Sequence, residues 1–256
     1  MQILITGIGR TGTTGLFSKV KNSLPENNQF LHEPKVVNSL GKNCLVKLNI
    51  FRVMENPILL TIPKKILLIR DQRDRIISSL LFGLFQTWEG KEKRLFKVLD
   101  LLKQKESSPE SLSVLKLHEH LHPNWDLRNQ AKKYCKGLIK FSREQKVLVY
   151  YYEEFVKQNF KPLEDYLGLP LSGSSDLGKR KYVLRTGSSG DWGNWFCKED
   201  IDFFRPLLQK YMEIFGYEDN WNLKSPQRIP PEVASDYVLK IVNDLRLRNG
   251  LEPVDV

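Results

Sequence analysis

The first fifteen residues constrain the fold of this chain more than any other stretch. A short apolar run rich in β-branched residues ends at Gly7, and Gly12 follows five positions later. Leu16, Phe17 and Val20 then recur at helical spacing. The order is strand, glycine-rich loop and helix, in which the loop turns its N–H groups inward beside the unpaired donors of the helix N-terminus. This arrangement favours a binding site for a phosphate-like anion. The alternative is an ordinary strand-to-helix turn in which Arg10 points into solvent.

The spacing of this loop resembles the Walker A pattern, in which a lysine reaches the β- and γ-phosphates and the next hydroxyl holds magnesium. Gly7 and Gly12 stand at the two glycine positions, but Thr13 replaces the lysine and Thr14 follows it. This replacement argues against hydrolysis of ATP or GTP. The loop carries a cation at Arg10 instead, whose guanidinium offers a planar fork of donors to an oxyanion.

Length and composition indicate a globular α/β chain. The 256 residues suffice for one domain, and 41% hydrophobic with 27% charged residues excludes the disordered and collagen-like classes. No run approaches the roughly 18 apolar residues of a membrane span. The first residues read as a core strand and not as a leader, so we expect a cytoplasmic protein. Cys44, Cys135 and Cys197 are far apart and odd in number, so we expect buried small hydrophobes and no disulfide framework.

The formal net charge of +10 favours an anionic partner. A nucleotide, an acidic glycan, a nucleic acid and a membrane surface all fit this description. Lysines and arginines are spread along the chain with acidic residues between them, so we expect no nucleic-acid partner.

Alternating strands and helices predict a mostly parallel sheet. Apolar runs predict further strands at 44–50, 66–70 and 146–152. Helical spacing predicts helices at 76–84, 131–141, 198–215 and 233–248, the first of them after a charged turn at 70–74. Residues 30–34 are expected to be extended or a loop rim, and 184–196 are too rich in glycine for a core element. We predict an α/β fold in one domain over 1–256, with a mostly parallel sheet flanked by helices and a C-terminal helical extension at about 222–256.

The segment from His118 to Pro123 contains three histidines at alternate positions. Their spacing does not match the usual zinc spacings, and no nearby cysteine completes a set of ligands. Because Pro123 favours a loop, we expect partial exposure or substrate contact for these side chains and no metal site.

In an open parallel sheet, ligands bind beyond the carboxyl ends of the strands. The loop with Arg10, the turn that starts at Arg70 and the strand end from Lys47 to Asn49 would meet there. Ser78 lies eight positions after Arg70, two turns into the following helix, where a bound nucleotide would bridge the two residues. Arg185 would close over the same anion from a glycine-rich loop.

In these stretches the chain resembles the sulfotransferases that use 3′-phosphoadenosine 5′-phosphosulfate (PAPS). The family's 5′-phosphosulfate loop resembles Gly9-Arg10-Thr11-Gly12-Thr13-Thr14. Its 3′-phosphate motif resembles Arg70 through Ser78, and its C-terminal loop resembles Arg185-Thr186-Gly187 with Gly190-Asp191-Trp192 following. The three motifs occur in the family's order between about residues 3 and 216.

The resemblance implies a P-loop-like fold, PAPS as the sulfuryl donor, and no requirement for a metal. It implies that the donors of the loop from Gly9 through Thr14 hold the 5′-phosphosulfate. It also implies that Arg70, Ser78 and Arg185 hold the 3′-phosphate, with Thr186 and Gly187 beside them.

Two positions depart from the cytosolic members of the family. Many of these members carry lysine where Arg10 stands, although the tyrosylprotein and several carbohydrate enzymes have arginine. The aromatic residue that follows the Thr-Thr pair near the adenine is Gly15 here. Trp192 or Trp195 would substitute for it, but core packing is the safer interpretation of each tryptophan.

The catalytic base is sought among residues that resemble the family's. Cytosolic members have Lys-Thr-His where Lys47-Leu48-Asn49 stands, and the amide of Asn49 cannot take a proton at neutral pH. Glu33 resembles the glutamate region of the carbohydrate and tyrosylprotein branches and is the first candidate. His32 is the second, and a solvated loop carboxylate is the alternative for Glu33.

The predicted activity is in-line transfer of a sulfuryl group from PAPS to an acceptor hydroxyl, or less favourably an amine. Glu33 would remove the acceptor proton, while Arg10, Lys47 and the loop N–H groups would stabilise charge on the departing 3′,5′-phosphoadenosine. The expected acceptor is a carbohydrate or a small hydroxylated metabolite. Two alternatives stay open: a P-loop kinase or nucleotide hydrolase, and a non-catalytic nucleotide- or glycan-binding protein of the same fold.

Overall fold

The structure is a computed structural model that describes residues 1–84, 92–175, 177 and 184–255. The chain divides into two compact units. The sheet unit comprises Met1–Asp71 and Lys133–Lys181, and the helical unit comprises Gln72–Lys132 and Tyr182–Val256. The single domain and its C-terminal helical extension stay predictions.

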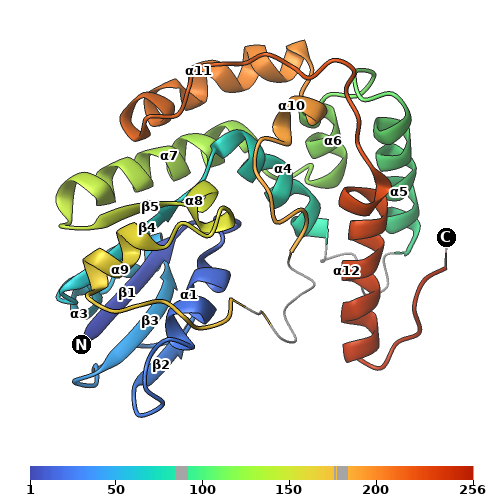
Figure 1. The fold of residues 1–256 in the computed structure, drawn as a ribbon. Helices are drawn as coiled ribbons and strands as arrows, with labels where there is room; N and C mark the ends of the chain where they lie inside the picture. The colour runs from blue at the N-terminus through green and yellow to red at the C-terminus, as the bar shows by residue number, and fades with distance from the viewer. Residues whose placement is uncertain (85–91, 176, 178–183, 256) are drawn as a thin grey trace. The chain divides into compact units, whose positions relative to one another are not determined.

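In its described residues, the sheet unit contains five parallel strands in the order β2-β3-β1-β4-β5 (Figure 1). The bounds are Gln2–Gly7 for β1, Gln29–His32 for β2, Cys44–Asn49 for β3, Lys64–Ile69 for β4 and Leu148–Tyr151 for β5. The strand order reverses at β1, because β3 pairs with one of its edges and β4 with the other. Such a reversal is where open parallel sheets bind ligands. The predicted α/β fold with a parallel sheet is confirmed.

One face of the sheet packs against α1 (Thr13–Lys21) and α9 (Lys161–Leu167). The buried side chains of this core come from alternate strand positions and from the apolar stripes of the helices; they are Ile3, Ile5, Leu16, Phe17, Val20, Leu45, Ile66, Leu68, Tyr150, Leu163, Leu167 and Leu171. Successive residues of a strand point to opposite faces, and Leu4, Val46 and Leu67 are equally buried. Burial on both faces explains the continuous apolar sequence of these strands.

Short helices follow the carboxyl ends of β3 and β5 in this unit. They are α2 (Ile50–Met54), α3 (Pro57–Leu60) and α8 (Tyr152–Val156). The longer α7 (Leu127–Glu144) approaches α2 closely at Gly137, where a Cβ atom would lie 2.7 Å from the ring of Phe51. A larger residue at this position would push the two helices apart.

The helical unit is built from α4 (Gln72–Gly83), α5 (Glu92–Ser107), α6 (Val114–Leu121), α10 (Trp192–Trp195), α11 (Lys198–Phe215), the 3₁₀ helix η3 (Pro231–Val233) and α12 (Ser235–Arg248). Asp200 joins two of these helices. Its buried carboxylate accepts the N–H groups of Val114 and Leu115 at the start of α6, at 3.0 Å each, and that of Cys197 beside α11 at 2.9 Å. Donors that a helix leaves unpaired at its N-terminus are thereby satisfied.

Several local predictions are wrong in instructive ways. The charged turn at 70–74 is shorter than predicted, since α4 begins at Gln72 and Asp74 in its first turn complements the helix dipole. His118 and His120 lie on α6 and not in a loop, because Pro123 restricts only the residue before it, His122, where the helix has already ended. The glycine-rich stretch 184–196 contains the short helix α10.

Other local predictions are confirmed. Residues 30–34 begin as the extended edge strand β2, and α11 has the predicted bounds. Trp192 and Trp195 are core residues. The prediction of buried cysteines is confirmed for Cys44 and Cys135 but wrong for Cys197, which is partly exposed. Within the described part of the chain, no helix has both the length and the apolar character needed to cross a membrane.

Candidate functional site

The loop between β1 and α1 presents backbone donors at the carboxyl end of the central strand. Its backbone is left-handed at Arg10, with φ of 71°, and at Gly12, with φ of 87°. Buried Thr11 stabilises this conformation by donating its hydroxyl to the Ile8 carbonyl at 2.8 Å. Gly12 is the N-cap of α1, and among the described residues no side chain caps this helix. The N–H groups of the first turn, from Thr13 onward, are therefore placed to serve an anion.

Arg70 and Tyr152 hold the glycine loop from the ends of β4 and β5. The Arg70 guanidinium lies over the Tyr152 ring, 4.3 Å from its centroid, and Nη1 donates to the Arg10 carbonyl at 3.2 Å. A Cβ atom at Gly12 would lie 2.6 Å from the same tyrosine ring. Arg70 thus joins the loop of Arg10, as the sequence predicts, and it also supports the backbone of that loop.

Gly15 stands where the resembling family has an aromatic residue. A Cβ atom at this position would lie 3.1 Å from Cζ of Phe155 in α8. The ring of Phe155 therefore occupies the space beside Gly15, which explains why a bulky side chain is absent there.

Glu33 and Lys47 form an ion pair near the carboxyl ends of β2 and β3. Lys47 Nζ lies 2.6 Å from Glu33 Oε1, and Arg52 Nη1 lies 3.7 Å from Oε2. The backbone of Glu33 is left-handed, with φ of 50°, and its N–H donates to the Lys47 carbonyl at 2.8 Å. Strained backbone of this kind persists where the surroundings over-determine it and is concentrated at functional sites.

The two other candidates at this edge have different surroundings. His32 ends β2, level with Lys47, and packs edge-on against Phe17 of the core with ring centroids 5.1 Å apart. Asn49 caps α2, since its Oδ1 accepts the N–H of Phe51 at 3.1 Å. The asparagine that replaces the family's histidine thus has a structural role of its own.

The loop that carries Arg185 is ordered by a buried ion pair in the helical unit. Arg185 Nη1 donates to Asp191 Oδ2 at 2.7 Å, and the arginine side chain is 2% exposed. Its Nε and Nη2 atoms are buried and have no hydrogen-bond partner among the described residues. Nε and Nη2 lie on one edge of the guanidinium, the edge that binds carboxylate or phosphate with two parallel bonds.

Asp74 fastens this loop to α4. Its carboxylate accepts the N–H groups of Gly190 at 2.5 Å and Trp192 at 2.8 Å. Next to it, the Arg73 guanidinium lies 4.2 Å from the Trp192 ring centroid and 5.1 Å from that of Trp221. The backbone on both sides of Asp191 is therefore fixed.

The remaining predicted residues of this unit lie on α4 and in the loop. Ser78 is buried on α4. Thr186 Oγ1 accepts the N–H of Ser188 at 3.2 Å, and Gly187 supplies a left-handed turn with φ of 62°. Arg10 and Arg70 belong to the sheet unit, whereas Ser78 and Arg185 belong to the helical unit. The convergence of the three loops on one ligand stays a prediction.

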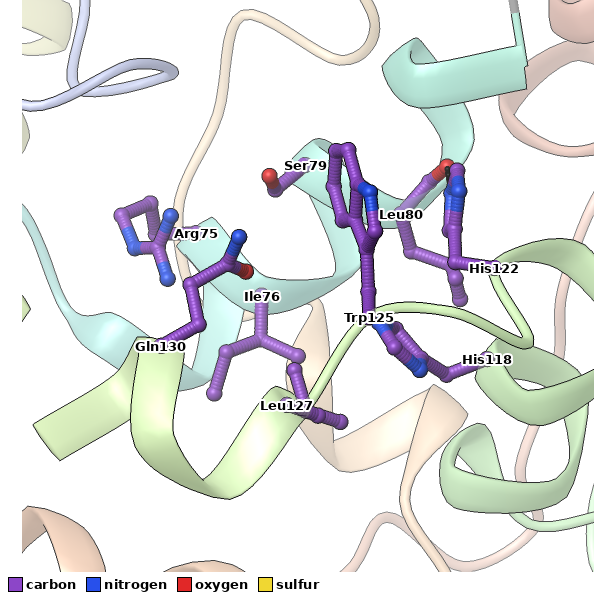
Figure 2. A pocket seen from close by; sticks show the side chains of 9 residues that line it. All are labelled: Arg75, Ile76, Ser79, Leu80, His118, His122, Trp125, Leu127 and Gln130. Carbon is purple, nitrogen blue, oxygen red and sulfur yellow. Dashed lines mark hydrogen bonds between the residues drawn. The ribbon is translucent and has the colours of Figure 1, made fainter.

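A small pocket lies between α4, α6 and the start of α7. It is lined by Arg75, Ile76, Ser79, Leu80, His118, His122, Trp125, Leu127 and Gln130. Figure 2 shows Arg75 and Gln130 at one end, with Trp125 and the two histidines at the other. The pocket volume of about 10 Å³ admits roughly one water molecule.

The predicted partial exposure of the three histidines is wrong for His118 and His122, which are buried, whereas His120 is exposed. Burial, with a smaller effect of His122, lowers the pKa of His118 to about 4. Burial also lowers the pKa of His122, whose ring stacks on Trp125 with centroids 4.5 Å apart. In the described ranges, no group of three or more His, Cys, Asp or Glu side chains is arranged to hold a metal ion.

Sequence reasoning missed three residues that shape the site. Tyr152 was expected at the end of a strand, Asp74 in a charged turn, and Asp191 in the C-terminal loop motif without a role of its own. No spacing in the sequence singles out these three side chains, because their roles depend on contacts in three dimensions.

A parallel sheet with a glycine loop between its central strand and the first helix defines a P-loop-like α/β fold. Among solved structures, the chain is similar to mouse sulfotransferase SULT7A1 complexed with PAP, with a TM-score of 0.52 and 16% sequence identity. The similarity covers 83% of this chain and 84% of that one, and it shows that the two share a fold. No protein-family model matches the sequence, and no curated protein matches it.

Proposed function

We propose that this chain is a sulfotransferase that transfers a sulfuryl group from PAPS to a hydroxyl group of an acceptor and releases 3′,5′-phosphoadenosine (PAP). The fold shared with a PAP-complexed sulfotransferase supports the class of activity. The acceptor that we propose is a small hydroxylated molecule or a carbohydrate, on the resemblance of Glu33 to the carbohydrate branch.

The buried guanidinium of Arg185 carries the proposal. A charged group with two unpaired donors costs roughly 1 to 3 kcal/mol for each donor left unsatisfied. An anion with adjacent oxygens removes this cost, and phosphate has the matching geometry. The uncapped N-terminus of α1 offers a second set of donors, and Gly12 keeps the Tyr152 ring close to it.

These residues fit the two anionic ends of PAPS. The N–H groups of Gly9, Thr11, Thr13 and Thr14 and the hydroxyls of Thr13 and Thr14, with Gly12 and Arg10, would hold the 5′-phosphosulfate. Arg70, Ser78 and Arg185, with Thr186 and Gly187, would hold the 3′-phosphate. When bound, PAPS supplies a sulfuryl group on a phosphosulfate anhydride, and this chemistry needs no metal.

The residues near the carboxyl ends of β2 and β3 would remove the proton of the acceptor and stabilise charge on the leaving group. Glu33 accepts the proton of the acceptor hydroxyl, and Oε2 is the oxygen not already bonded to Lys47. Lys47 and Arg10 stabilise negative charge on the departing PAP, together with the N–H groups of the loop. His32 is the second candidate for the base, although its ring packs on Phe17.

Ligand titration separates this proposal from its two alternatives. We expect isothermal titration calorimetry to detect binding of PAP without magnesium, and to detect no tight binding of Mg-ATP. Tight Mg-ATP binding without PAP binding would support a kinase or hydrolase. Binding of PAP with no transfer of label from radioactive PAPS to a broad panel of sugars and small alcohols would support a non-catalytic binding protein.

The role of Glu33 has its own test. We expect Glu33→Gln to lower kcat for sulfuryl transfer by about 100- to 10,000-fold with little change in PAP affinity, because the amide cannot accept the proton. Glu55→Gln, an exposed position in the same unit, is the matched control and should keep full activity. Unchanged kcat in Glu33→Gln would transfer the assignment to His32 and leave the sulfotransferase activity standing.

A further inference from the structure

Arg185 is buried in a way that leaves one specific edge unsatisfied. Its Nη1 atom bonds to Asp191, whereas Nε and Nη2 on the opposite edge have no hydrogen-bond partner in the described part of the chain. The ion pair is largely buried, with side-chain exposures of 2% for Arg185 and 14% for Asp191. The carboxylate therefore fixes the guanidinium without occupying the pair of donors that a phosphate requires.

Asp191 itself is held in one position. Besides Arg185, its Oδ2 accepts the indole N–H of Trp195 at 3.0 Å, and its Oδ1 accepts the Asn194 amide at 3.3 Å. The residues on either side of it donate their N–H groups to Asp74. A side chain that is bonded at both oxygens and anchored at both neighbouring peptides has little freedom to turn.

We propose that Asp191 is a positioning residue that orients Arg185 toward the 3′-phosphate and thereby sets the preference of the chain for 3′-phosphorylated adenosine nucleotides. This inference rests on the proposed function, since it takes the 3′-phosphate of PAPS as the partner of Arg185. It adds that the preference depends on a residue that does not touch the nucleotide. Without Asp191 the arginine side chain keeps its charge but loses its fixed direction.

The test compares two ligands that differ only by the 3′-phosphate. Affinities for PAP and for adenosine 5′-monophosphate are measured by calorimetry with the full chain. We expect Asp191→Ala to weaken PAP binding by about 10- to 100-fold and to leave binding of the monophosphate within about twofold. Asp191→Asn, which keeps one oxygen acceptor, should lose less.

Two further variants make the result specific. Arg185→Ala should reduce the preference for PAP at least as much as Asp191→Ala does. Adding Asp191→Ala to it should weaken PAP binding no further, since both changes remove one interaction. Asp219→Ala is the matched control, because Asp219 also accepts an arginine at 2.7 Å and a tryptophan indole at 2.6 Å, but its ion pair is exposed. We expect no change in the ratio of affinities for this variant.

The outcomes separate the inference from the function on which it rests. A reduced PAP preference in Asp191→Ala and Asp191→Asn, with circular dichroism unchanged in at least the asparagine variant, supports the role of Asp191. A preference that survives both substitutions overturns this role and leaves the proposed function standing. If the unaltered chain fails to bind PAP, or binds it no better than the monophosphate, both the function and the inference are overturned.

Discussion

At the scale of single residues, the glycine loop after β1 depends on backbone geometry as much as on its polar groups. Gly12 has a left-handed φ of 87°, and a Cβ atom there would lie 2.6 Å from the Tyr152 ring. Gly9 lies three positions earlier in the same loop, with no atom within 4 Å of its Cβ position. The two glycines therefore serve different purposes, since only Gly12 is required for the fold.

Substitution of these glycines tests the distinction. We expect Gly12→Ala to lower the free energy of unfolding by about 2 to 3 kcal/mol, because it combines a left-handed alanine with a steric clash. Gly9→Ala is the matched control and should change it by less than about 0.5 kcal/mol. Urea denaturation of both variants measures the difference. Equal destabilisation by the two substitutions would show that the clash with Tyr152 is not what selects glycine at position 12.

Local sequence patterns predicted where two segments of the candidate site lie. The loop of Arg10 and the strand end at Arg70 lie as predicted, because glycine spacing and an apolar run fix them locally. The partners of these residues were not predictable. Tyr152 beneath Arg70 and Asp191 beside Arg185 are chosen by packing in three dimensions, and no spacing along the chain encodes such a contact.

At the scale of secondary-structure elements, long periodic helices such as α11 and buried strands such as β4 were predictable because each has a continuous apolar pattern. The start of α4 was predicted too late, and a loop was predicted where α6 carries His118 and His120. Gln72 and the charged residues at 73–75 are buried at the start of α4, which a polar sequence does not suggest. The short helix α10 has too few residues for any period to be recognised.

The junction of α6 and α11 yields a prediction about elements. Asp200 accepts three backbone N–H groups in a fully buried site, and Asn cannot replace both carboxylate oxygens because its amide is a donor. We expect Asp200→Asn to lower the free energy of unfolding by about 2 to 4 kcal/mol. Asp202→Asn, at an exposed position of the same helix, should have an effect below about 0.5 kcal/mol. Chemical denaturation of both variants measures these free energies. Similar losses of stability in Asp200→Asn and Asp202→Asn would contradict the prediction.

At the scale of the whole molecule, the net charge of +10 and the buried histidines make the stability of the fold depend on pH. Acidification adds positive charge to a chain that already has an excess of it. Part of this response has a single identifiable source. His118 is 6% exposed, it lies in the small pocket beside His122, and burial holds it neutral in the folded state.

The sign of the His118 effect follows from its two pKa values. The pKa is about 4 in the folded chain and about 6.5 in the unfolded chain, so the unfolded state binds the proton first as pH falls. Stability is retained above about pH 6.5 and lost progressively between about pH 6.5 and pH 4, by a total on the order of 3 kcal/mol.

The last prediction isolates this contribution. We expect His118→Gln to flatten the fall in the free energy of unfolding between about pH 7 and pH 4, even if the variant is less stable at every pH, because glutamine does not titrate. His120→Gln, an exposed position on the same helix, is the control and should keep the slope of the unaltered chain. Urea denaturation at a series of pH values measures these slopes. Parallel curves for the unaltered chain and His118→Gln would mean that buried His118 is not the group whose protonation destabilises the fold.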